Sequence, residues 1–201
     1  MPAKKKPVPY SRPRLSRSEG EVALMKAAYE LMTEIDVADI TTTDIAERAG
    51  LNRAHISRYF TTRNELLSAA IEYDFFERFN RVIESRKSDP SVQYDLFGAE
   101  ADQLRLRNKV VAYLISVGVP QARFHESQRF LTERLTMFLH NDENSERTNN
   151  LLGKMSALLM IGYQASGELI EATEQDRADM LQLMAVLPSN MKPIEKLLGW
   201  K

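Results

Sequence analysis

The chain of 201 residues contains no cysteine, which excludes disulfide cross-links, cysteine-ligated zinc and thiolate catalysis. It lacks any apolar run near the ~20 residues that a membrane-spanning helix needs. No apolar segment follows its basic N-terminus, as a secretory signal would require. With 43% hydrophobic and 27% charged residues, the composition is that of a soluble globular protein. We therefore expect a cytoplasmic protein.

Net charge is also low, at −1, but the charges are unevenly distributed. Residues 1–18 hold six basic residues and no acidic one, whereas the rest of the chain holds 21 basic and 28 acidic residues. Four of the eight prolines fall in the same stretch and exclude a helix there. We interpret residues 1–17 as a flexible basic arm, although a tail that only aids solubility is the alternative. Its cations are Lys4, Lys5, Lys6, Arg12, Arg14 and Arg17.

Strand alternation is absent as well, and the apolar residues recur at helical spacing, which predicts an all-α fold. The expected helices cover about 19–35, 41–49, 53–60, 62–89, 99–117, 121–140, 146–172, 175–187 and 191–198, with a loop over 88–98. The first four have capping signals at their N-termini, in the pairs Ser18–Glu21, Thr41–Asp44 and Thr62–Glu65 and in Asn52.

Residues 41–60, TTTDIAERAGLNRAHISRYF, are the most informative stretch. Two short helices joined by a tight turn have the geometry of a helix-turn-helix motif. Gly50 supplies the backbone freedom that this turn needs. The second helix must be buried on one side only, and Ile56 marks that side. Helical spacing directs the following residues to the same side: Phe60, Asn52 and Tyr59.

The opposite side of this second helix carries small, hydrogen-bonding and cationic side chains, which suit base edges in a DNA groove. These outward residues are Ala54, His55, Ser57 and Arg58. Three further residues are placed to contact backbone phosphates, namely Thr42, Arg53 and Arg63. The stretch therefore predicts a DNA-reading helix.

The run from residue 40 to residue 67 resembles the DNA-binding domain of the TetR family of bacterial transcriptional regulators. The family pattern is met by Thr41, Asp44-Ile45-Ala46, Ala49-Gly50 and Tyr59-Phe60, and is approximated by Arg63 and Asn64-Glu65-Leu66-Leu67. The chain has Ser57 where the family commonly has Tyr, and Tyr59 where it commonly has His, which affects the expected operator sequence. The resemblance implies contact with double-stranded DNA by Thr42, Thr43, Arg53, Ala54, His55, Ser57, Arg58, Tyr59 and Arg63.

The resemblance also implies a two-domain organisation. Residues 18–65 would form a three-helix DNA-binding domain with the helix-turn-helix, and residues 66–201 a helical domain for effector binding and dimerisation. A long helix would join the two domains. A homodimer would then bind a palindromic operator with its two recognition helices in successive major grooves. Beside a DNA-reading helix, we expect the basic arm of residues 1–17 to contact phosphates or the adjacent minor groove.

The segment 146–172 is apolar on more than one face, which favours burial on two sides. One side would face the core and the other a second subunit, although both could be the core of a monomer. With the resemblance, this predicts a dimer interface formed by Leu151, Met155, Leu158, Gly162, Met180, Leu183, Met184 and Leu187.

A small-molecule effector is expected in the C-terminal domain. Nine methionines suit an adaptable apolar site, and no cluster of charges marks it, so we expect a largely apolar ligand. The candidate lining residues are Tyr113, Phe130, Met137, Phe138, Met160, Tyr163 and Gln164, although side chains of these types at helical spacing are also typical of ordinary core.

Catalytic and metal-binding patterns are missing. His55, His125 and His140 have no metal-ligating partner one helical turn away, and there is no phosphate-binding glycine loop or nucleophile elbow. We therefore predict no enzyme activity, no cofactor and no metal. The leading hypothesis is an effector-released repressor. The alternatives are a nucleoid-associated or cell-division factor of the same fold that acts through a protein partner, and a helical ligand carrier that does not bind DNA.

Overall fold

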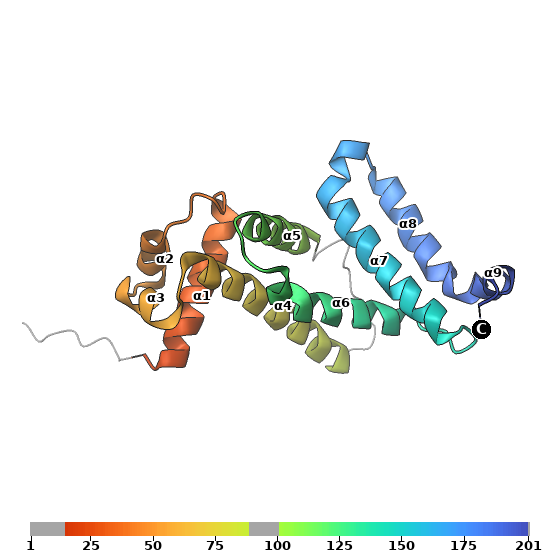
Figure 1. Cartoon of the computed structure of the whole chain (residues 1–201), viewed down its shortest axis with the longest axis horizontal. Coiled ribbons are helices and arrows are strands. Elements are labelled where there is room, and N and C mark those ends of the chain that lie inside the picture. Colours follow the sequence, from red (N-terminus) through yellow and green to blue (C-terminus); the bar gives the residue numbers. More distant parts are fainter. Residues whose placement is uncertain (1–14, 89–100, 201) are drawn as a thin grey trace, which may run out of the picture.

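The computed structural model describes residues 15–88 and 101–200, and every regular element in these ranges is helical, as predicted (Figure 1). Short 3-10 turns stand before α6 and after α7 and α8, at Gln121–Phe124, Glu168–Ile170 and Pro188–Asn190. The α-helices are α1 (Arg17–Glu34), α2 (Thr42–Ala49), α3 (Ala54–Tyr59), α4 (Arg63–Ser88), α5 (Ala101–Ser116), α6 (His125–Phe138), α7 (Glu146–Ser166), α8 (Glu174–Val186) and α9 (Met191–Leu198).

The N-terminus of α1 differs from the prediction. The capping box is formed by Ser16 and Glu19, because the Ser16 N–H donates to the Glu19 carboxylate at 2.8 Å and the Glu19 N–H donates to the Ser16 hydroxyl at 3.3 Å. Glu21, the predicted partner of Ser18, instead pairs with Arg17 at 2.7 Å. Arg17 therefore belongs to the helix, while the other arm cations lie in residues 1–14, outside the described residues.

The predicted capping signals of α2 and α4 are confirmed, whereas α3 begins one residue later than predicted, with Arg53 rather than Asn52 at the N-cap position. Thr41 and Asp44 form a capping box at α2, and Gly50 ends that helix in the left-handed region with φ 65°. The Asn52 side-chain oxygen accepts the Ala54 N–H at 2.9 Å, and the Thr62 hydroxyl accepts the Glu65 N–H at 3.0 Å. Each signal acts within three residues, so the turns around the recognition helix α3 are set locally.

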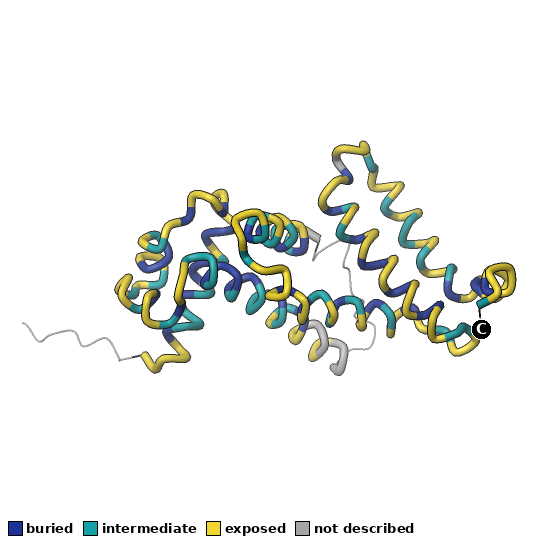
Figure 2. Tube along the Cα trace, in the orientation of Figure 1, coloured by how far each residue is buried: buried dark blue, intermediate teal, exposed yellow. Residues whose placement is uncertain are grey.

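Two hydrophobic clusters share the helices α4 and α5 (Figure 2). The first contains the buried residues of α1–α3 and the first half of α4, and it takes in Val110 and Leu114 of α5 and Phe124. The second contains Phe75 and Phe79 of α4 together with Leu104 of α5 and buried residues of α6 and α7. The buried core therefore continues past residue 65, and the predicted domain division stays a prediction.

A third cluster joins α9 to the rest of the chain, and a buried carboxylate reinforces it. Glu195 is 4% exposed and accepts hydrogen bonds from the Ser145 N–H and hydroxyl, both at 2.8 Å, and from the Thr148 hydroxyl. Ser145 is the N-cap of α7, so Glu195 fastens α9 to the start of that helix. These hydrogen bonds to the charged form lower the pKa of Glu195 to about 2.

The depressed pKa predicts a pH-dependent stability. In the unfolded chain a glutamate has a pKa of about 4.3. The stabilisation from Glu195 is therefore fully present above that pH and is lost as the pH falls toward 2. A Glu195→Gln variant should therefore be less stable than wild type at pH 7, and the difference should shrink by pH 3. Urea unfolding at pH 7, 5, 4 and 3 measures this, and a pH-independent difference would contradict the assignment.

Candidate nucleic-acid interface

The recognition helix α3 is anchored on one side and open on the other. Ile56 and Phe60 are 3% and 8% exposed and pack into the first cluster. Ala54, Ser57 and Arg58 are exposed, as the helical spacing predicted. A helix of six residues that is held by one buried side presents its other side to solvent. This open side has the composition that base-edge contacts require.

His55, which the spacing directed outward, does not lie fully on the open side, whereas Tyr59 lies on the inner side that the spacing predicted, although the resemblance assigned it to DNA contact. Both are half-buried, and His55 Nδ1 lies 3.2 Å from the Tyr59 hydroxyl. The Tyr59 ring packs on Gly20 of α1, where a Cβ atom would lie 2.9 Å from Tyr59 Cε2, and the Arg17 guanidinium carbon lies 5.9 Å from the ring centroid. These contacts fix α3 against α1. Asn52, predicted to point inward, is exposed.

Arg63 is held by the domain itself rather than left open for a phosphate. Its guanidinium donates to the backbone carbonyls of Val37 and Ile40 in the α1–α2 connection and, at 3.3 Å, to the Tyr113 hydroxyl of α5. The guanidinium carbon also lies 6.0 Å from the Tyr113 ring centroid. The structure thus gives Arg63 a bridging position that the sequence did not predict, because these partners are 23 to 50 residues away.

The remaining predicted DNA contacts are more accessible. Thr43 and Arg53 are exposed, and Thr42 is half-buried in the first turn of α2. Sequence reasoning missed Arg48, whose guanidinium donates to both carboxylate oxygens of Glu34, at 2.8 and 2.6 Å. This ion pair joins α2 to α1. It therefore stabilises the packing of the helix-turn-helix and is not part of the open side of α3.

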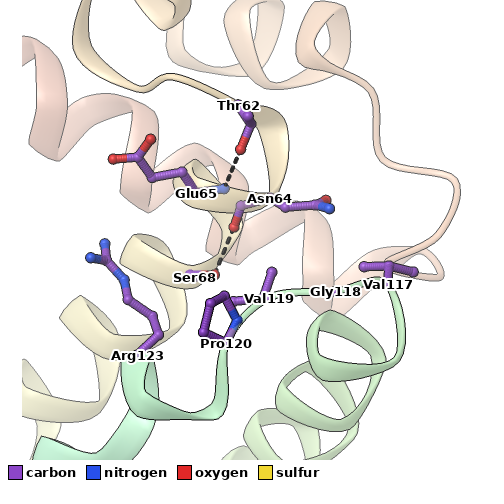
Figure 3. A pocket seen from close by; sticks show the side chains of 9 residues that line it. All are labelled: Thr62, Asn64, Glu65, Ser68, Val117, Gly118, Val119, Pro120 and Arg123. Atoms are coloured by element: carbon purple, nitrogen blue, oxygen red, sulfur yellow. Dashed lines mark hydrogen bonds between the residues drawn. The ribbon is translucent and has the colours of Figure 1, made fainter.

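A cleft of about 480 Å³ lies directly after the recognition helix, between the start of α4 and the α5–α6 connection (Figure 3). None of the predicted effector residues lines it. Its hydroxyls are engaged within the fold, since Thr62 accepts from Glu65 N–H and Ser68 donates to the Asn64 carbonyl at 2.7 Å. The lining residues are Thr62, Asn64, Glu65, Ser68, Val117, Gly118, Val119, Pro120 and Arg123.

Only part of the predicted effector set comes together. Phe130, Met160 and Tyr163 meet in the second cluster, and Gln164 follows them on α7. Tyr113 instead lies in the first cluster beside Arg63. Met137 and Phe138 are 67% and 69% exposed at the end of α6. Periodicity predicted their helix correctly, but it does not distinguish an interior apolar side chain from one on the surface.

The predicted dimer residues lie mainly on the outer side of α7 and α8. Leu151, Met155, Leu158 and Leu183 are 37%, 42%, 69% and 58% exposed, and Gly162 is exposed. Met180, Met184 and Leu187 are half-buried, and the last two pack on the third cluster. On α7 the core side consists of different residues, including Leu152, Ala157 and Met160. On α7 the predicted stripe is therefore separate from the core side, whereas Met184 of α8 and its C-cap Leu187 contact the core.

No group of three or more His, Asp or Glu residues in the described ranges could hold a metal ion. Within those ranges no helix is long and apolar enough to cross a membrane.

The capped helix-turn-helix with its anchored recognition helix defines a DNA-binding domain. Residues 24–70 match the family described as bacterial regulatory proteins, tetR family, and this match covers α2, α3 and most of α1. Residues 24–70 therefore form a DNA-binding domain of the type found in TetR-family transcriptional regulators. No curated protein and no solved structure matches the chain.

Proposed function

We propose that the protein is a repressor that binds a palindromic operator as a homodimer and is released from DNA by a small, largely apolar effector. The observation that carries this proposal is the open side of α3, formed by Ala54, Ser57 and Arg58 on a helix that Ile56 anchors. An arginine can donate two hydrogen bonds to guanine, serine can donate or accept, and alanine can touch a thymine methyl group. We assign phosphate contacts to Thr42, Thr43 and Arg53.

A second copy of the chain is proposed to cover α7 and α8. No residue of α8 is buried, although the helix carries Leu183 and Val186, which are 58% and 47% exposed. An isolated helix of 13 residues is marginal in water, and packing of an apolar side is what normally stabilises it. Figure 1 shows α7 and α8 running antiparallel at the end of the molecule away from α1–α3, where a two-fold partner would leave both recognition helices free.

The basic arm is proposed to contact phosphates or the minor groove next to the site read by α3. Support comes from Arg17, whose guanidinium lies against Tyr59 of the recognition helix. The N-terminus of α1 therefore lies beside the recognition helix. Arms of this kind reach the minor groove adjacent to a recognition helix.

Release would act through α4 and α5, because both helices belong to the two hydrophobic clusters. Lys109 of α5 pairs with Asp36 at the end of α1 at 3.1 Å, and Tyr113 of α5 contacts Arg63. A ligand that moves α5 against α4 within the second cluster would thus shift the helix-turn-helix. The result is a population shift between DNA-competent and incompetent dimers.

An Arg58→Ala variant tests the proposed function. Operator sequences are first selected from random DNA with the wild-type protein, and affinity for the selected sequence is then measured at fixed salt concentration. Arg58→Ala should weaken specific binding roughly tenfold or more, because one base contact is worth about 1–3 kcal/mol, while leaving the dimer intact. Arg129→Ala removes an equally exposed arginine from α6 and serves as the matched control. Equal affinities for the two variants would show that α3 does not read DNA.

A further inference from the structure

Three buried polar atoms on α5 and α7 have no hydrogen-bond partner in the part of the chain that the structure describes. They are Gln103 Oε1 and Arg107 Nε of α5, and Gln164 Nε2 of α7. Arg107 and Gln164 are 3% and 6% exposed, so water at the surface does not reach them. Buried polar groups in folded proteins are nearly always paired, and leaving one unpaired is costly. Each of the three atoms therefore lacks a partner, which the described residues do not supply.

An aromatic cluster lies beside Arg107, one of these three residues. The Arg107 guanidinium carbon lies 4.8 Å from the Phe75 ring centroid, and Phe130 meets Phe76 and Phe79 with ring centroids 5.6 and 5.1 Å apart. Gln103 and Arg107 are four residues apart on α5 and so share one side of that helix. Gln164 accepts a hydrogen bond from Asn108 of α5 at 2.9 Å, which brings its amide to the same helix. Arg107 thus links the aromatic rings to α5, and Asn108 links α5 to Gln164.

The charge balance of this region favours an uncharged molecule. The cation of Arg107 already lies 2.8 Å from the Glu72 carboxylate, and both side chains are largely buried. An added carboxylate would lie near Glu72 without an unpaired cation to neutralise it. The unpaired atoms instead require a hydrogen-bond acceptor for the N–H groups of Arg107 and Gln164, and a hydrogen-bond donor for the Gln103 oxygen. A hydroxyl group provides both.

We propose that the effector is an uncharged aromatic molecule with a hydroxyl group, held by its rings against Phe75 and Phe130 and by its hydroxyl at Gln103, Arg107 and Gln164. This proposal rests on the effector-controlled function proposed above and names its ligand class. It also assigns the effector to the α5–α7 interior rather than to the cleft beside α4. In that cleft, Thr62 and Ser68 already have partners within the fold.

The test uses 2-naphthol as the probe and the full chain without DNA. Binding is measured by isothermal titration calorimetry, with naphthalene and 2-naphthoate as matched probes that lack the hydroxyl or carry a negative charge. We expect 2-naphthol to bind at least tenfold more tightly than either. Gln103→Met should weaken 2-naphthol binding at least fivefold while leaving the ligand-free protein as stable as wild type or more stable, because it removes an unpaired buried oxygen.

Two results would overturn the proposal. Equal binding of naphthalene and 2-naphthol, or an unchanged affinity in Gln103→Met, would show that the polar atoms do not recognise the ligand. Absence of binding by all three probes would assign those atoms to buried water instead. Because the titration contains no DNA, these failures leave the proposed operator binding intact, and that function is judged separately by the Arg58→Ala measurement.

Discussion

Replacing Gly153 with alanine is expected to destabilise the fold by about 3 kcal/mol, the upper end of the usual cost of overpacking. Gly153 is buried where α7 crosses α6, and an added Cβ would lie 1.9 Å from the Thr136 hydroxyl oxygen and 2.9 Å from the Thr136 Cα. A side chain could rotate away, but the Cα belongs to the α6 backbone. The two helices would have to separate, and thermal or urea unfolding would report the loss.

Gly162 supplies the matched control, because it lies on the same helix and an added Cβ would meet nothing within 4 Å. Gly162→Ala should leave stability unchanged or raise it by up to about 1 kcal/mol through the higher helix propensity of alanine. Both variants must be measured at one protein concentration, since a dimer couples stability to concentration. Equal stabilities of Gly153→Ala and Gly162→Ala would mean that the fold does not depend on the close approach of α6 and α7 at Gly153.

The helix-turn-helix could be predicted from the sequence because its determinants are local. The Thr41–Asp44 capping box and the left-handed Gly50 act across at most three residues, and the Ile56–Phe60 spacing is one helical turn. The start of α1 shows the limit of such signals. Ser16–Glu19 and Ser18–Glu21 have the same spacing, and the difference comes from Glu21, which pairs with Arg17.

The candidate effector site could be predicted only in part, because it depends on contacts between distant segments. Arg63 and Tyr113 are 50 residues apart in sequence, and nothing near either residue indicates that they meet. Met137 shares its helical periodicity with buried residues, yet it is 67% exposed, because none of the described elements covers its side chain. Nothing in the sequence indicated that Gln103 and Arg107 contribute polar atoms to the interior, since a polar residue in an amphipathic helix is normally on the surface.

The second large effect is expected at the ion pair between α4 and α5. Glu72→Gln should destabilise the protein by about 3 kcal/mol or more, because it leaves the Arg107 cation without its counter-charge in the interior. Arg107 Nη2 lies 2.8 Å from the Glu72 carboxylate and also donates to the Ser127 hydroxyl of α6, so this cation joins three helices. Burial lowers the pKa of Arg107, while the neighbouring carboxylate opposes that shift.

A double variant separates the cost of an unpaired charge from loss of packing. Glu72→Met combined with Arg107→Met removes both charges and keeps apolar volume, so it should recover most of the stability that Glu72→Gln loses. Glu133→Gln, which breaks the solvent-exposed pair with Arg129, should change stability little. The free energies of unfolding in urea are compared for wild type, Glu72→Gln, the double variant and Glu133→Gln. A double variant no more stable than Glu72→Gln would mean that the pair stabilises the α4–α5 contact by direct attraction. If the double variant recovers the stability that Glu72→Gln loses, the role of the ion pair is to fix how α4 and α5 pack together.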